Sequence, residues 1–327
     1  MTKLEWCREN APKGLGDLSD VELLELMGSS YERFVEDKDL KFVDFIWLNY
    51  KRLSHNNELK NKQVSLLVGT GLCEPNDGME FCFVPTLHMK KLEDEILQLY
   101  KQVNVADNVA GLCNEVFYTS KIEGANTTIK RTQMIHDGAP VDKNNLFSES
   151  MLLGSFRATK YFNIVGNKLN EEILLKAWNI LTENCCANTS IKGAKYRTGN
   201  VQVGSHVGLN YLLIEDAMSL WLNYYNSSKL NSHPFIKAAL LHYSFESIHP
   251  FCDGNGRIGR MLFNNFLIAK GFDKFKAISV SRSIEKDRFE YDVAFNVSDN
   301  AYGDCTYFIE YMLTQVLDAL CDILNLN

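Results

Sequence analysis

Two strongly apolar stretches, separated by a short run of polar and glycine residues, constrain the fold of this chain more than any other feature of its sequence. The second stretch repeats apolar residues every three or four positions and stops at Gly271, as a buried helix does. The apolar residues are Phe235, Ala238, Ala239, Leu240, Leu241 and Phe245 in the first stretch, and Ile258, Leu262, Phe266 and Ala269 in the second. The pattern predicts two buried helices, at about 234–247 and 256–270, joined by a loop.

The loop has the composition of an anion-binding site. Gly254 and Gly256 lack a β-carbon, so the backbone can turn tightly and bring its N–H groups close to a ligand. The second helix presents its positive N-terminal end at the same place. Arg257 and Arg260 are three residues apart and are therefore neighbours on one helix face, where two guanidinium groups suit a polyphosphate.

Asp253 and His249 add the groups that chemistry on a phosphate needs. Asp253 offers a hard oxygen ligand beside the phosphates, as Mg²⁺ requires. His249 belongs to a residue type with an ordinary pKa of about 6.5, so it can accept a proton from a hydroxyl near neutral pH. Each of these residues taken alone is more often structural than functional. Their combination between two apolar helices favours a nucleotidyl-transfer site.

Composition and charge narrow the class of protein. The 327 residues carry 34 Lys and Arg against 41 Asp and Glu, a net charge of −7, so we expect no nucleic-acid partner. The nine cysteines are odd in number and form no CxxC pair, which indicates a reducing compartment and argues against a structural zinc site. The N-terminus is charged, and no run of about 18 apolar residues occurs, so we expect a cytoplasmic protein without a membrane span.

Helical periods dominate the rest of the chain. Helical patterns occupy residues 19–34, 38–52, 89–104, 108–123, 147–167, 170–185, 215–226 and 305–324. The polar stretch from Gly124 to about Asn145 is expected to be a connector with one short helix. Turn residues in Asn56–Pro85 allow short strands, and alternation around Gly199-Asn200 indicates a hairpin strand over Tyr196–Ser205. The predicted fold class is mainly α with one β-hairpin.

The loop resembles the signature of the Fic family, HxFx(D/E)GNGRxxR, at every fixed position. The matching stretch is His249-Pro-Phe-Cys-Asp-Gly-Asn-Gly-Arg-Ile-Gly-Arg260. Proteins of that family typically transfer AMP from ATP to a hydroxyl side chain of another protein. The resemblance therefore implies a helical bundle of the Fic type with a β-hairpin flap, and a nucleotidyltransfer enzyme that uses ATP and Mg²⁺.

The same resemblance implies a role for each residue of the signature. His249 is the general base, Asp253 the metal ligand, and Phe251 an anchor that points into the core. The residues implied to hold the nucleotide are Gly254, Asn255, Gly256, Arg257 and Arg260, the two arginines on the outer phosphates.

Two further stretches extend the resemblance. Residues 193–204 are similar to the family's G-x-YR-x-x-x-V-x-I-G flap, whose edge receives the main chain of the target protein. The implied docking residues are Val201, Gln202 and Val203. Residues 281–291 resemble the family's SRxI…YY stretch near the adenine, which implies that Tyr291 contacts the nucleotide, although Glu290 replaces the usual first Tyr.

The stretch Thr119-Ser-Lys-Ile-Glu-Gly124 fits the inhibitory pattern [ST]xxxE[GN] of the family. In Fic proteins that carry it, the glutamate pairs with the second arginine of the signature and displaces the γ-phosphate from its productive position. The implied pair is Glu123 with Arg260, and Thr119 begins the motif. An ordinary Glu-Gly at a helix end is the alternative interpretation.

These observations lead to one functional hypothesis. The chain is expected to be a protein adenylyltransferase that transfers AMP to a Ser, Thr or Tyr hydroxyl of a target protein and is autoinhibited by Glu123. The family also allows a homodimer. The predicted division is an N-terminal, mostly helical extension of unknown role over residues 1–105, the inhibitory helix and connector over 106–145, and the Fic catalytic core over 146–327.

Three alternatives stay open. The same site could remove AMP from a modified protein, with Glu123 positioning a water molecule. The chain could be a nucleotide-sensing or interaction module without catalysis. A nucleotide bound in the reverse direction would give phosphotransfer, but relatives that do this have a degenerate glycine loop, and Gly254-Asn-Gly256 is intact.

Overall fold

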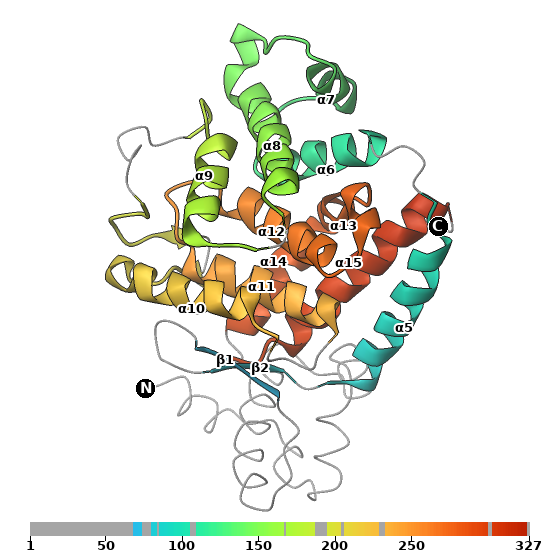
Figure 1. Ribbon diagram of the computed structural model, residues 1–327, viewed down its shortest axis with the longest axis vertical. Helices are drawn as coiled ribbons and strands as arrows, with labels where there is room; N and C mark the ends of the chain where they lie inside the picture. The colour runs from blue at the N-terminus through green and yellow to red at the C-terminus, as the bar shows by residue number, and fades with distance from the viewer. Residues whose placement is uncertain are drawn as a thin grey trace, which may run out of the picture.

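The computed structural model describes residues 68–73, 80–83, 85–104, 109–166, 168–186, 195–203, 206–228, 233–299 and 303–325. This part of the chain is mainly helical, as predicted (Figure 1). The helices predicted at 19–34 and 38–52 lie outside the described residues. The longer described helices are α5 (Leu87–Gln102), α6 (Val109–Ile122), α7 (Ile129–His136), α8 (Leu146–Val165), α9 (Glu171–Leu181), α10 (Ile214–Asn226), α11 (Pro234–Ile248), α12 (Asn255–Ala269), α13 (Val280–Lys286), α14 (Arg288–Asp299) and α15 (Thr306–Leu324).

Two small antiparallel sheets accompany the helices. Strands β1 (Val68–Cys73) and β2 (Glu80–Phe83) form the first sheet, within the stretch where short strands were expected. Strands β3 (Gln202–Val203) and β4 (His206–Val207) form the second, a minimal hairpin.

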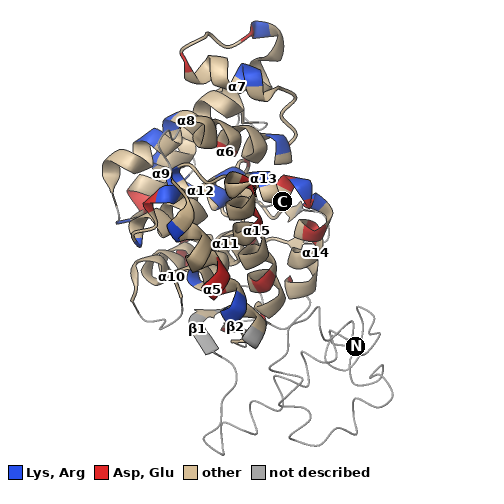
Figure 2. Cartoon of the chain, turned by 90° about the vertical axis from the view of Figure 1, so that its right-hand side faces the viewer, with Lys and Arg blue, Asp and Glu red and all other residues tan. Residues whose placement is uncertain are grey.

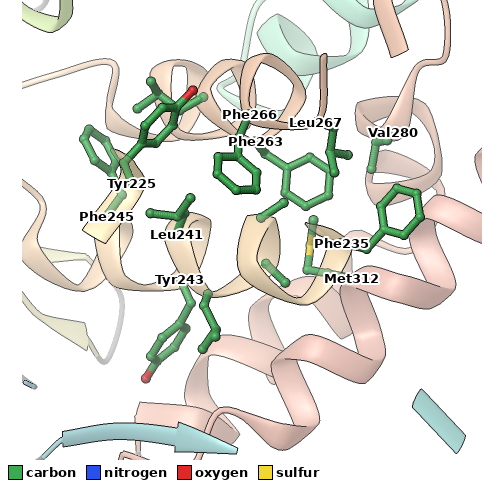
Figure 3. Close-up of a cluster of buried hydrophobic side chains, with 14 of the residues drawn as sticks. Tyr225, Phe235, Leu241, Tyr243, Phe245, Phe263, Phe266, Leu267, Val280 and Met312 are labelled. Carbon is green, nitrogen blue, oxygen red and sulfur yellow. The ribbon is translucent and has the colours of Figure 1, made fainter. Parts of the chain in front are cut away.

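Helices α11 and α12 form the centre of the hydrophobic core (Figure 3). Almost every residue of α11 is buried, which is the pattern of a helix surrounded by others. Pro234 begins the helix at a position that tolerates its missing N–H. The helix ends at Ile248 because His249 takes a left-handed conformation, with φ of +48°. The chain then reverses through the loop and enters α12, which packs back against α11.

Helix α6 packs against α13, α7, α8 and α12. Its Gly111 lies so close to the next segment that a β-carbon there would be 1.8 Å from the carbonyl oxygen of Ala277. The Glu115 carboxylate accepts hydrogen bonds from Ser279 Oγ at 2.9 Å and from Ser281 N at 3.0 Å. These contacts fix α6 in register, with its C-terminal end over the start of α12.

The structure corrects two predictions and adds two helices. The strand expected over Tyr196–Ser205, around Gly199-Asn200, is wrong in extent: only Gln202–Val203 is paired, and its partner is His206–Val207. The residues before this strand are not paired in a sheet: the Arg197 guanidinium donates to the carbonyl oxygens of Ile248 and His249 at the end of α11. Helix α9 ends at Leu181, before the predicted end at 185. Helices α13 and α14 were not predicted.

Residues before 105 contribute to the same core as the later helices. Leu72, Phe83, Met89 and Ile96 are buried in one cluster with residues of α11, α12 and α15, and α5 packs along α15. The division predicted at residue 105 stays a prediction. Figure 2 shows Lys and Arg interspersed with Asp and Glu on the face that it displays. No described helix is both long enough and apolar enough to cross a bilayer.

Candidate active site

Aromatic stacking and one amide hold the α11–α12 loop in place. Phe251 is buried and stacks on Trp178, with ring centroids 4.5 Å apart, which confirms its predicted place in the core. The indole N–H of Trp178 donates to the carbonyl oxygen of Asp253 at 2.9 Å. The Asn255 amide accepts from Phe251 N at 2.9 Å and donates to Phe251 O at 2.8 Å. Asn255 therefore clamps the loop with its side chain.

Gly254 opens the N-terminus of α12 to a ligand. Its φ of +78° is a conformation that favours glycine, and a β-carbon there would lie 3.0 Å from Thr182 Cγ2. As the N-cap residue it has no side chain to bond the first N–H groups of the helix. These donors and the helix dipole together attract an anion.

His249 lies at the end of α11, with its side chain 18% exposed. Arg197 Nε donates to its carbonyl oxygen at 2.7 Å and so fixes the backbone. Burial lowers the pKa of His249 to about 4, and the nearby charges of His206 and Arg197 contribute in the same direction. The imidazole is therefore neutral at pH 7, which is the form that can accept a proton.

Arg260 is bound by the C-terminal turn of α6. Its Nη2 donates to Glu123 Oε1 at 2.6 Å, its Nε donates to Thr119 Oγ1 at 2.9 Å, and Nη2 also reaches the Thr119 carbonyl at 3.2 Å. Burial alone would raise the pKa of the Glu123 carboxyl, but the Arg260 guanidinium more than offsets this and the net pKa is lowered. Glu123 is therefore ionised and paired. The contact predicted between these two residues is present.

Gly256 makes room for this contact. A β-carbon at position 256 would lie 2.2 Å from Glu123 Oε1 and 3.1 Å from Arg260 Nη1. Glu123 thus sits directly against the backbone of the first turn of α12, where an anion would bind.

The groups around His249 line a cavity of about 400 Å³. This volume lies in the range of small-molecule sites. The lining residues are Glu123, His206, Glu246, Ser247, His249, Gly256, Arg260, Arg288, Tyr291, Asp292, Phe295 and Asn296. Five of the residues singled out in the sequence are therefore brought together in it: His249, Gly256, Arg260, Glu123 and Tyr291.

Apart from Tyr291, sequence reasoning missed the wall of the cavity that α14 forms. Residues 288, 291, 292, 295 and 296 share one face of α14, and their spacing is a helical signal that was readable. His206 was missed because it reaches the cavity from the hairpin, where its ring bonds Asp299 Oδ2 at 2.9 Å. Glu246 precedes the signature by one turn of α11.

Glu246 and Tyr291 are held in unusual electrostatic surroundings. Burial raises the pKa of Glu246 to about 8, against the opposing charge of Arg260, so its carboxyl is mostly protonated at pH 7. Its Oε2 lies 3.8 Å from His249 Nδ1. The Tyr291 hydroxyl lies 2.7 Å from His242 Nε2. Burial lowers the pKa of His242 to about 3, so this ring is neutral.

Other predicted residues lie apart from the cavity. Arg257 is buried with its Nη2 3.6 Å from Asp253 Oδ1, and its Nη1 donates to Cys185 Sγ at 3.3 Å. It lines a second cavity of about 160 Å³ instead. The two arginines of the signature thus line different cavities. On the flap, Gln202 is exposed and Val201 is half-buried.

The donor set suits a metal ion that arrives with a phosphate ligand. No group of three or more His, Cys, Asp or Glu side chains suited to a metal occurs among the residues with a described position. Mg²⁺ is commonly held by one or two carboxylates together with substrate phosphates. Asp253, just before the N-terminus of α12, provides one such carboxylate beside the anion-binding backbone.

The fold and the site define a helical protein in which a glycine-rich loop leads to an uncapped helix N-terminus, with a neutral histidine at the edge of the loop. Residues 168–267 match the sequence model of the Fic/DOC family. This stretch of the chain, which includes the loop from His249 to Arg260, is therefore similar to the Fic/DOC family.

Named relatives match part of the chain. The chain is 34% identical over 168 residues to "Protein adenylyltransferase Fic" of Drosophila ananassae, a match over 48% of this chain and 32% of the relative. It is 27% identical over 262 residues to the protein of the same name in Aedes aegypti, covering 75% and 49% of the two chains. The matched region thus spans between a third and a half of these relatives.

Two solved structures share the fold. A Fic family protein from Desulfovibrio desulfuricans superposes with a TM-score of 0.65 at 22% identity, over 75% of this chain and 76% of that one. Fic-1 of Caenorhabditis elegans, residues 134–508, gives a TM-score of 0.63 at 17% identity, over 99% and 91% of the two chains. The Fic-type helical fold expected from the sequence is confirmed.

Proposed function

We propose that this chain is an ATP-dependent protein adenylyltransferase that is restrained by Glu123. One observation carries the proposal: a neutral His249 shares a cavity with Arg260 and with Gly256 at the uncapped N-terminus of α12. This is a base next to a polyanion site. The name "Protein adenylyltransferase Fic" of the relatives supports the same reaction class.

The residues of the site have separate roles in the proposed reaction. The hydroxyl oxygen of a Ser, Thr or Tyr in a target protein attacks the α-phosphorus of ATP, and its proton passes to His249. The bond between the α-phosphorus and the bridging oxygen breaks, and pyrophosphate leaves. The N–H groups of the first turn of α12 and the freed Arg260 offset the negative charge of the leaving group. Mg²⁺ held by Asp253 would neutralise further phosphate charge.

The contact of Glu123 with Arg260 opposes this reaction. The carboxylate occupies a donor of the guanidinium that a phosphate would need, and it lies against Gly256 where the anion would approach. We propose that ATP binds productively only when Glu123 leaves this position. We also propose that the protein acts in the cytoplasm, that its target protein docks on the flap, and that the chain forms a homodimer.

Removal of AMP from a modified protein is a second candidate. Glu123 is ionised and lines the cavity that contains His249, so its carboxylate can position a water molecule there. Glu123→Gly would abolish the removal of AMP. The same substitution would increase adenylyl transfer if the chain is a transferase.

The test uses ATP labelled at either the α- or the γ-phosphate, with Mg²⁺. Glu123→Gly and the double variant Glu123→Gly with His249→Ala are incubated in parallel, and label in protein is followed. We expect label from the α-position only, and none in the double variant. Label from the γ-position only would show phosphotransfer, and α-label in the double variant would remove the base role of His249.

A further inference from the structure

The second cavity lies behind α6, away from His249. It has a volume of about 160 Å³ and is enclosed by α6, α8, α12 and the segment after α12. Its apolar walls are Leu112 and Val116 of α6, Phe162 of α8, Met261 and Ile268 of α12, and Phe275. A cavity of about 150 Å³ with walls of this kind holds a benzene ring.

Three polar side chains of this cavity carry nitrogen or oxygen atoms without a hydrogen bond. Within the described residues, Ser155 Oγ, Arg257 Nε, Arg257 Nη2 and Asn264 Oδ1 make no hydrogen bond. All three side chains are at least nine-tenths buried and line the cavity. A buried polar group without a partner costs stability, so these atoms favour an occupant of the cavity that can bond to them.

The partnerless atoms define the chemistry of that occupant. The Arg257 N–H is a donor and requires an acceptor, whereas Asn264 Oδ1 is an acceptor and requires a donor. A carboxamide carries both, as C=O and NH₂. The mouth of the cavity is formed by exposed Asn163 and Lys276, so a small molecule can enter from solvent.

We propose that this cavity binds a small aromatic carboxamide and that the bound molecule holds α6 in its present position. Thr119 is part of the cavity wall, and its hydroxyl accepts the hydrogen bond from Arg260. A ligand that needs this wall binds only while α6 is docked and therefore stabilises the docked state. The proposal concerns binding and does not depend on the reaction proposed above.

The test is a titration of the full chain with benzamide, followed by NMR. The wild type is compared with Asn264→Leu, which removes the acceptor at nearly constant volume, and with the matched surface variant Asn179→Leu. We expect Asn264→Leu to bind benzamide about tenfold more weakly, the loss of one hydrogen bond, and Asn179→Leu to bind as the wild type does. Benzene should bind the wild type and Asn264→Leu equally well.

Two variants together distinguish a loss of binding from a loss of folding. Ser155→Leu fills the cavity and should abolish binding of both probes, while Asn264→Leu keeps the shape of the core and should fold. Absence of benzamide binding to the wild type, or equal affinity in Asn264→Leu, would overturn the site.

Hydrogen exchange tests the second half of the proposal without any nucleotide. Saturating benzamide should slow amide exchange in α6 of the wild type and leave it unchanged in Ser155→Leu. Binding without slower exchange in α6 would show that the cavity takes a ligand but that the ligand does not hold α6.

Discussion

At the scale of single residues, the chemistry depends on the protonation state of His249. Burial and the charges of His206 and Arg197 hold its pKa near 4, below the ordinary value of about 6.5. The His249 imidazole is therefore almost entirely neutral at pH 6. It becomes protonated, and is lost as a base, only as the pH falls through about 4.

This sets the acid limb of the pH profile. The rate of α-label transfer by Glu123→Gly should stay constant between pH 6 and 8 as far as His249 is concerned, and decline below about pH 5. Initial rates across this range, with circular dichroism as the control for folding, measure it. A decline centred near pH 6.5 would contradict the buried environment found for the imidazole.

At the scale of elements, the loop between α11 and α12 depends on one left-handed glycine. Gly254→Ala places a β-carbon 3.0 Å from Thr182 Cγ2 in a backbone with φ of +78°. We expect the free energy of unfolding to fall by about 1–2 kcal/mol, the usual cost of that conformation for a residue with a β-carbon. Urea denaturation measures it.

Gly199→Ala is the matched control for this change. Gly199 has no neighbouring atom within 4 Å of the added carbon and no positive φ. Its variant should unfold at the same urea concentration as the wild type. Equal effects of the two substitutions would mean that the loop is not strained at position 254.

The sequence predicts well those elements whose signals are local. Helices α5, α6, α8, α10, α11, α12 and α15 were expected within about two residues of their observed bounds, because each carries a complete apolar stripe. The strand over Tyr196–Ser205 was predicted too long because Arg197 binds the carbonyl oxygens of Ile248 and His249, which are distant in sequence, and such long-range contacts leave no local pattern.

At the scale of the whole molecule, α5 and α15 join the early and late parts of the chain in one core. Ile96 of α5 is fully buried in that core. Ile96→Ala should lower the free energy of unfolding by about 2–5 kcal/mol, and amide exchange should accelerate in α11 as well as in α5. The exposed Lys91→Ala on the same helix should do neither. Faster exchange confined to α5 would support a separate unit before residue 105.

The candidate site was predictable only where it is contiguous. The loop from His249 to Arg260 and the motif ending at Glu123 are short stretches with fixed spacing, and the structure brings His249, Arg260 and Glu123 to one cavity. His206 and the face of α14 come from separate elements and meet the loop only after folding. The spacing of Arg257 and Arg260 in the sequence does not show that the two side chains line different cavities.

The central claim is that the end of α6 restrains the site through Arg260. Thr119→Val removes one acceptor of that guanidinium, and Glu123→Gly removes the charged one. Initial rates of α-label transfer should therefore rise from wild type to Thr119→Val to Glu123→Gly. The rate of Glu123→Gly should exceed that of Thr119→Val by about tenfold or more, as expected for the loss of a hydrogen bond to a charged partner.

Glu183→Gly is the control for this series, because it breaks an exposed pair of the same kind, 2.8 Å from Arg157. Its rate should equal that of the wild type. Measuring these four rates side by side tests the account most directly: the predicted order supports restraint by α6, whereas equal rates in wild type and Glu123→Gly would contradict it.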